Sequence, residues 1–227
     1  MYRKVSVPAT TPRSVRAFIA TVCDVYLADV HAMLRLPCSD AGITQACNFA
    51  VAATLLNAIS GASVVLYEPP ANNIRGAGRK FKGLAREFYP WRLEPTGFVK
   101  DGDRGSRLLY NTFRNPMSHA FGFQEKNPRG PINITRVAGN GFTEQELEDI
   151  ETSTWRPGLR LGGAGTLLVN QATNEVSLNG EAFYWGIREM FNNICSDANR
   201  MRAAAAYLDP LLVQNDQNQA NDRIVLH

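Results

Sequence analysis

Apolar residues recur at three- and four-residue steps along the N-terminal part of the chain, which is the period of an amphipathic helix. The first such stretch runs from Thr11 to Leu36, with Pro12 near its start and Pro37 just after its end. A second runs from Thr44 to about Tyr67, where a glutamate and two prolines stop it. Because the apolar surface of this second stretch is nearly continuous, we expect it to be the central core helix.

The middle of the chain is basic and is divided by turn residues. A short basic helix is predicted from Arg79 to Tyr89, and Pro90 ends it. A loop follows. Asp103 then has the residue type and the position of an N-cap for a helix that runs to about Phe121.

Beyond Gly122 the pattern changes from helical to mixed. Residues 132–137 have the composition of a strand, and residues 142–153 predict a short acidic helix with Thr143 as its cap and Glu146 completing a capping box. Two further runs, 166–170 and 175–178, flank a turn and predict a hairpin. These elements predict a small α+β insertion at about residues 130–180.

The last apolar run predicts a long helix from about Glu181 to Leu208, ended by Pro210. Residues 211–227 include QNDQNQAND, which is too polar to fold alone, so we expect a mobile tail. The sequence therefore predicts a mainly α protein. It forms one helical-bundle domain over residues 1–210, with a small strand-containing insertion before the last long helix.

The chain raises the question of a membrane span, because no Asp, Glu, Lys or Arg occurs between Asp40 and Glu68. Polar side chains interrupt this run, and they are costly in lipid but can be satisfied in a buried bundle helix. They are Gln45, Asn48, Thr54, Asn57, Ser60 and Ser63. We therefore expect no membrane span. The N-terminal MYRKVSVPATTPR has positive charge but no apolar stretch behind it, so we expect no secretory signal and a cytoplasmic protein.

Common motifs of metal and cofactor chemistry are missing from the sequence. The cysteines show neither CxxC nor Cys/His zinc spacing, so we expect reduced thiols and no metal site. They are Cys23, Cys38, Cys47 and Cys195. No glycine-rich phosphate loop, GxSxG elbow or HExxH pattern occurs. The commonest classes of nucleotide-binding protein, hydrolase and zinc enzyme, which these motifs mark, are therefore not indicated. We expect no cofactor.

Charge is distributed unevenly along the chain, although the net charge is only +3. Between Arg75 and Arg136 there are thirteen Lys or Arg against five acidic residues, a balance of +8, whereas the rest of the chain has a balance of −5. A basic block of this size suits a polyanion such as nucleic acid. It is equally the composition of a solvated helix surface, and the sequence leaves both interpretations open.

Three histidines occur, in different settings. His31 lies within the first amphipathic helix, where we expect a packed or surface residue, and His227 lies in the tail. His119 lies five residues after Arg114 and four after Asn115, in the segment RNPMSH of the basic block. This segment is the candidate for chemistry.

The segment resembles the hallmark of the HEPN superfamily, in which an Arg, often followed by Asn, precedes a His by four to six residues on a bundle helix. The layout is also similar, since two long helices precede the motif helix and another closes the chain. The insertion at about 130–180 is not part of the minimal HEPN bundle.

The resemblance implies a metal-independent endoribonuclease that acts as a homodimer with a composite site. It implies that Arg114 stabilises charge on the phosphorus, that His119 moves a proton to or from the reacting oxygens, and that Asn115 orients the site. Other residues near the motif are then expected to contact RNA: Arg104, Arg107, Tyr110 and Ser118. A toxin or defence role, with an antitoxin or another protein as partner, is associated with the family.

Two other functions stay open. The chain is also compatible with a HEPN-like bundle that has no nuclease activity and binds RNA, a nucleotide or a protein partner. The third alternative is an unrelated helical protein in which the motif is accidental.

The geometry of the motif requires a departure from an ideal helix, on which positions 114 and 119 are about 140° apart. Asn115 and His119, in contrast, share a face. Because Pro116 lacks an N–H, we expect a kink or a helix restart there, with Asn115 as the N-cap. Such a restart leaves free amides around Met117 and Ser118 that can face an anion.

Overall fold

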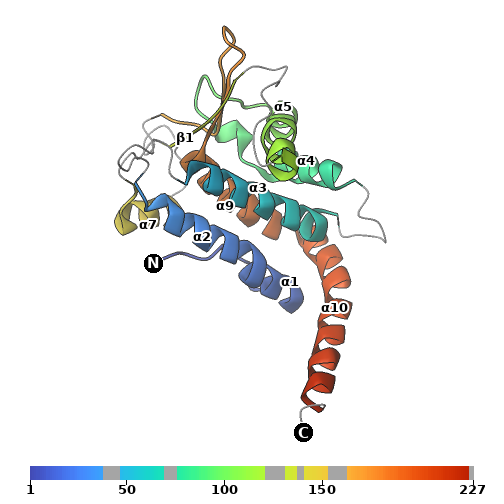
Figure 1. Ribbon diagram of the computed structural model, residues 1–227. Helices are drawn as coiled ribbons and strands as arrows, with labels where there is room; N and C mark the ends of the chain where they lie inside the picture. The colour runs from blue at the N-terminus through green and yellow to red at the C-terminus, as the bar shows by residue number, and fades with distance from the viewer. Residues whose placement is uncertain (38–46, 69–75, 121–130, 137–140, 153–162, 225–227) are drawn as a thin grey trace.

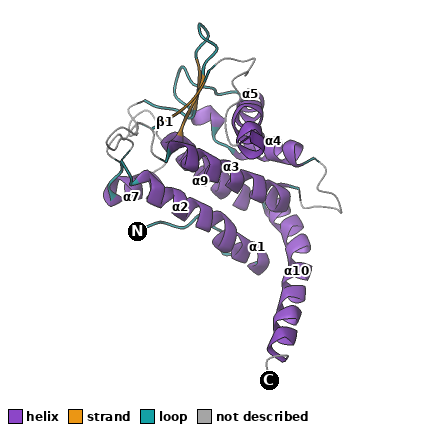
Figure 2. Cartoon of the chain, viewed as in Figure 1, coloured by secondary structure: helices purple, strands orange, loops and turns teal. Residues whose placement is uncertain are grey.

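A computed structural model of the chain describes residues 1–37, 47–68, 76–120, 131–136, 141–152 and 163–224, without the side chains of residues 118–120 and 215–224. The described part is a bundle of helices with a three-stranded sheet at one end (Figure 1). Helices and short helical turns make up most of it (Figure 2). The predicted mainly α fold with a small strand-containing insertion is therefore confirmed.

The two predicted N-terminal helices are both present. The first consists of α1 (Arg13–Phe18), the π-helical turn η1 (Ile19–Cys23) and α2 (Asp24–Leu34). The second consists of α3 (Asn48–Ala62) and the π-helical turn η2 (Ser63–Tyr67). Helix α3 packs against α2, α4 and α9, which confirms it as the central core helix.

Both stretches, Arg13–Leu34 and Asn48–Tyr67, are long and apolar enough to cross a membrane. The apolar face of α3 is explained by its neighbours, because four of its aliphatic side chains are almost completely buried within the bundle: Val51, Leu55, Leu56 and Ile59. A core helix of this kind has the same composition as a membrane span.

The basic middle of the chain folds into α4 (Ala77–Phe88), the 3₁₀ turn η3 (Trp91–Leu93), α5 (Gly102–Leu108), the π-helical turn η4 (Leu109–Arg114) and α6 (Asn115–Ala120). Gly105 permits the close contact of α5 with Trp91, since a Cβ there would lie 2.5 Å from the indole ring. The N-cap of α5 is Asp101, whose carboxylate accepts the Arg104 N–H at 2.6 Å. The prediction of Asp103 as the cap is wrong, because the chain becomes helical directly after Asp101.

The insertion contains β1 (Ile132–Thr135), α7 (Glu144–Thr152), β2 (Leu167–Val169) and β3 (Val176–Asn179). β2 and β3 form the predicted antiparallel hairpin, with Leu167 opposite Leu178. β1 pairs in parallel with β3, so the strand order is β1-β3-β2. The predicted capping box is present, since the Thr143 N–H and hydroxyl both donate to Glu146 at 2.8 Å.

The last part of the chain forms two helices instead of one, α9 (Gly180–Cys195) and α10 (Ala198–Ile224). Asp197 separates them and accepts hydrogen bonds from the N–H groups of Asn199 and Arg200, which starts a new helix. Pro210 lies inside α10, so the prediction that it ends the helix is wrong. A proline removes one backbone hydrogen bond, and the preceding run of four alanines strongly favours helix. Beyond Pro210 the helix continues to Ile224 and extends away from the bundle (Figure 1).

Candidate functional site

The helix that contains the RNPMSH motif is continuous. Asn115 has helical angles, φ −66° and ψ −47°, and its N–H bonds to the carbonyl of Tyr110. The π-helical turn η4 ends at Arg114, two residues before Pro116, and a π turn is one of the ways in which a helix accommodates a proline. The predicted restart with Asn115 as N-cap is therefore wrong. The predicted anion site at free amides around Met117 and Ser118 is not formed either.

Arg114 is half-buried and is held by uncharged partners. Its Nε donates to Ser60 Oγ at 3.3 Å, and the Ser60 hydroxyl in turn donates to the Leu56 carbonyl at 2.9 Å. Its guanidinium lies 5.5 Å from the centroid of the Tyr110 ring, a cation–π distance. Within the described ranges no carboxylate lies at ion-pair distance from Arg114. The guanidinium thus has a fixed position and no compensating carboxylate among the described residues.

Tyr110 connects Arg114 with helix α4. Its ring packs on Phe81 with the centroids 5.4 Å apart, and Lys82 Nζ lies 5.3 Å from the Tyr110 centroid. Gly78 makes room for it, because a Cβ at that position would lie 2.6 Å from the ring. Arg114 and Lys82 are both within 5.5 Å of one centroid, so their charges are no more than about 11 Å apart.

The remaining predicted site residues divide into three groups. Asn115 is exposed next to Arg114, and Arg104 is exposed on α5, where its backbone N–H donates to the cap Asp101. Arg107 is exposed on α5 and lines a pocket between α5 and α4. The side chains of Ser118 and His119 lie outside the described residues. The backbone of α6 places His119 one turn beyond Asn115, on the same face.

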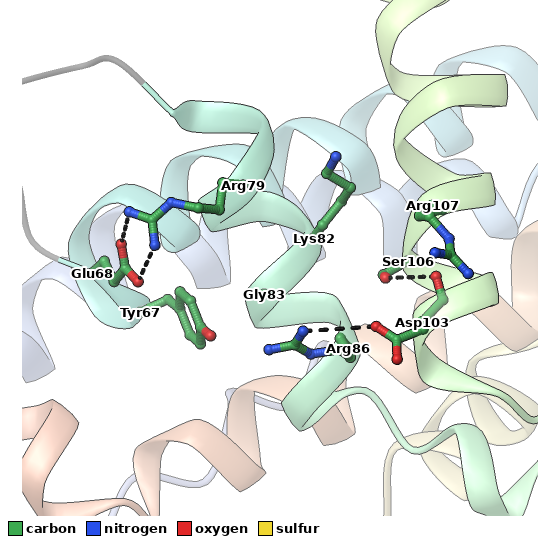
Figure 3. Close-up of a pocket in the computed structure, with 9 residues that line it drawn as sticks. All are labelled: Tyr67, Glu68, Arg79, Lys82, Gly83, Arg86, Asp103, Ser106 and Arg107. Carbon is green, nitrogen blue, oxygen red and sulfur yellow. Dashed lines mark hydrogen bonds and ion pairs between the residues drawn. The ribbon is translucent and has the colours of Figure 1, made fainter.

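The pocket beside Arg107 has a volume of about 360 Å³ and is lined by side chains from η2, α4 and α5 (Figure 3). Four of its lining residues are basic and two are acidic. The basic ones are Arg79, Lys82, Arg86 and Arg107, and the acidic ones are Glu68 and Asp103. The α4 members recur at three- and four-residue steps, so a helical projection of residues 77–88 would have found this basic stripe.

Two other cations of the basic block have structural roles. Lys80 is buried and its amine donates to the Glu68 carbonyl at 2.6 Å. Arg136 is buried, with Nε 3.3 Å from Glu181 and Nη2 donating to the Leu34 carbonyl at 2.6 Å. The predicted balance of +8 therefore overstates the charge available to a ligand. Arg75, Lys126 and Arg129 lie outside the described residues.

The other titratable groups near the core belong to the structure of the bundle. His31 is buried, with its Nδ1 2.8 Å from Glu151 and its Nε2 3.2 Å from Glu144, which fits a packed histidine. Cys23, Cys47 and Cys195 are free thiols, and Cys38 lies outside the described residues. Burial raises the pKa of Cys195 to about 12, so its thiol is protonated at neutral pH.

No group of three or more His, Cys, Asp or Glu side chains with the geometry to hold a metal ion occurs in the part of the chain that the structure describes. Comparisons with models of protein families, with curated proteins and with solved structures find no significant match to this chain.

Proposed function

We propose that this protein is an RNA-binding endoribonuclease whose reaction needs no metal ion and whose site is built on Arg114, Asn115 and His119. The observation on which the proposal depends is the setting of Arg114. Its guanidinium is half-buried, fixed by Ser60 and Tyr110, and unpaired with any carboxylate of the described residues. A phosphodiester suits such a group, since a guanidinium can donate two parallel hydrogen bonds to it.

The positive charge around Arg114 supports binding of a strand. Lys82 also lies next to the Tyr110 ring, and it lines, together with Arg107, the pocket between α4 and α5. Successive phosphates of a nucleic acid can contact these cations while one linkage lies at Arg114. Binding of this kind weakens steeply as salt concentration rises, because bound cations release counterions from the strand.

In this proposal His119 either takes the proton from the ribose 2′-hydroxyl or gives a proton to the leaving oxygen. Arg114 stabilises the charge that develops on the phosphorus. Asn115 shares a face with position 119 and orients the reacting groups. One Arg and one His are few groups for phosphoryl transfer. We therefore propose that two chains meet at their motif helices, so that an isologous interface doubles the site.

The direct test is RNA cleavage in excess EDTA by wild type and by the variants Arg114→Ala, Arg114→Lys and His119→Ala. We expect His119→Ala to lower the cleavage rate by about 10²-fold or more while RNA affinity stays nearly unchanged, because proton transfer acts mainly in the transition state. We expect Arg114→Ala to lower both rate and affinity. Arg114→Lys restores part of the affinity and less of the rate, since an ammonium lacks the planar fork.

The matched control is Arg16→Ala, which removes an exposed arginine from α1, on the other side of α3 from the proposed site (Figure 1). It should leave cleavage and binding unchanged. Full cleavage activity in folded His119→Ala would rule out the proposed site. RNA binding that depends on Arg114 without cleavage by any variant would instead favour the non-catalytic binding module. A monomer by light scattering at high micromolar concentration would rule out the composite site.

A further inference from the structure

The pocket between α4 and α5 has features that the proposed cleavage site does not use. Figure 3 shows Gly83 of α4 at its centre, with side chains from three elements around it. Tyr67 and Glu68 come from the end of η2, Arg79 and Arg86 from α4, and the α5 residues close the opposite side. Its volume of about 360 Å³ lies at the small end of ligand pockets, so it has room for a terminal phosphate and part of the attached nucleotide.

Ion pairs fix some of the charges in this pocket and leave others uncompensated. Arg79 binds both oxygens of Glu68, at 2.8 and 2.6 Å. Arg86 Nη1 lies 3.7 Å from Asp103. Lys82 and Arg107, which lie on facing helices, have no carboxylate at ion-pair distance among the residues that the structure describes. These two cations therefore remain available to an anion.

The wall that Tyr67 contributes is held rigidly. A Cβ at Gly83 would overlap the Tyr67 ring, so only glycine allows this close approach. Arg200 stacks on the Tyr67 ring, with Cζ 4.1 Å from the centroid, and its Nη1 donates to the Tyr67 carbonyl at 2.6 Å. The Tyr67 hydroxyl donates to Glu87, which also pairs with Arg200 at 2.8 Å. A preorganised wall lowers the entropy cost of ligand binding.

Glu87 does not oppose an anion in the pocket. It lies outside the lining, and although burial alone would raise its pKa, the hydrogen bonds from Tyr67 and Arg86 and the charge of Arg200 lower it. Its negative charge is thus matched by two guanidinium groups. The lining itself has four cations and two carboxylates, an excess of two positive charges.

We infer that this pocket binds a phosphate monoester, the terminal phosphate of an RNA strand whose next linkages pass Tyr110 toward Arg114. A monoester has a charge of about −1.5 to −2 at pH 7 and three acceptor oxygens, which matches the excess charge of the lining better than a diester does. This inference rests on the proposed function only in taking the strand that carries the phosphate to be RNA. It makes the pocket a recognition site for a strand end.

The test is titration calorimetry of the full chain with short 2′-O-methyl oligouridylates, which lack the 2′-hydroxyl and cannot be cleaved by the proposed route. Three ligands differ only at the ends: a 5′-phosphate, a 3′-phosphate, or hydroxyls at both. We expect one phosphorylated end to bind about tenfold more tightly than the hydroxyl ends, since one charge-assisted contact is of this order. The preference should shrink as pH falls through about 6, where the monoester gains a proton.

The variant is Lys82→Gln combined with Arg107→Gln, which removes both charges and leaves shorter, neutral polar side chains at these partly or fully exposed positions. We expect it to abolish the preference for a phosphorylated end, while Arg16→Gln leaves it intact. Inorganic phosphate and a mononucleotide, added as competitors, distinguish a site for the free anion from one that also needs the strand. Equal affinity for all three oligonucleotides, or a preference that survives in the double variant, would overturn the inference. Because these ligands are not cleaved, the outcome is independent of whether Arg114 and His119 form a nuclease.

Discussion

Glu151 of α7 is a completely buried carboxylate that ties the insertion to the bundle. It accepts hydrogen bonds from His31 Nδ1 at 2.8 Å, from the Tyr184 hydroxyl at 2.5 Å and from the Arg3 N–H at 2.8 Å. Arg188 adds a guanidinium nitrogen 3.9 Å away. These partners come from the N-terminal segment, α2 and α9. Replacing this one carboxylate therefore perturbs four contacts between distant parts of the chain.

The substitution Glu151→Gln keeps the shape of the side chain, removes its charge and turns one acceptor oxygen into a donor. Breaking a buried charged cluster by removing one member costs about 3–5 kcal/mol, because the remaining groups stay buried without compensation. For a domain of this size each kcal/mol lowers the melting temperature by about 2–4 °C. We therefore expect the melting temperature to fall by roughly 6–20 °C.

The assay is thermal and urea unfolding followed by circular dichroism at pH 7. The matched control is Glu148→Gln, which removes an exposed carboxylate from the same helix and should change stability by less than about 0.5 kcal/mol. RNA binding measured well below the transition should be unchanged in both variants. A loss of less than about 1 kcal/mol for Glu151→Gln would refute the role of this carboxylate in joining the insertion to the bundle.

Three further predictions concern the core and the basic surface. Burial raises the pKa of Glu94, so this carboxyl binds a proton more tightly in the folded protein than in the unfolded chain. The free energy of unfolding therefore decreases as pH rises above the ordinary carboxyl range. Glu94→Gln should remove this loss, giving equal or higher stability at pH 7.5 but no gain at pH 4, as measured by urea unfolding. Gly83→Ala should destabilise the protein by about 1–3 kcal/mol, because its Cβ would overlap the Tyr67 ring. Gly61→Ala, where the same Cβ meets nothing within 4 Å, should instead stabilise α3 by about 0.5–1 kcal/mol, and equal effects at the two glycines would contradict the packing. The logarithm of the RNA association constant, measured by filter binding, should fall linearly with the logarithm of the salt concentration. An association constant that does not change with salt would show that these cations do not bind RNA phosphates.

Local patterns predicted most of the elements of this fold. The helical period of residues 11–36 and 44–67, the capping box at Thr143 and the hairpin around residues 171–174 all depend on residues a few positions apart. The same local reasoning failed at Pro116 and Pro210. In both places a proline was expected to interrupt a helix, and the chain instead continues it, through a π turn in the first case.

The candidate site was only partly accessible from the sequence. The sequence singled out the RNPMSH segment and the excess of basic residues around it, because composition and spacing are visible in one chain. The tertiary structure decided which of those cations are available. Arg136 and Lys80 are bound to groups of the core, whereas Lys82 and Arg107 line a pocket from two different helices. Whether a charge is compensated depends on partners that are distant in sequence, such as Glu181 for Arg136, and only folding brings such groups within the few ångströms over which they interact.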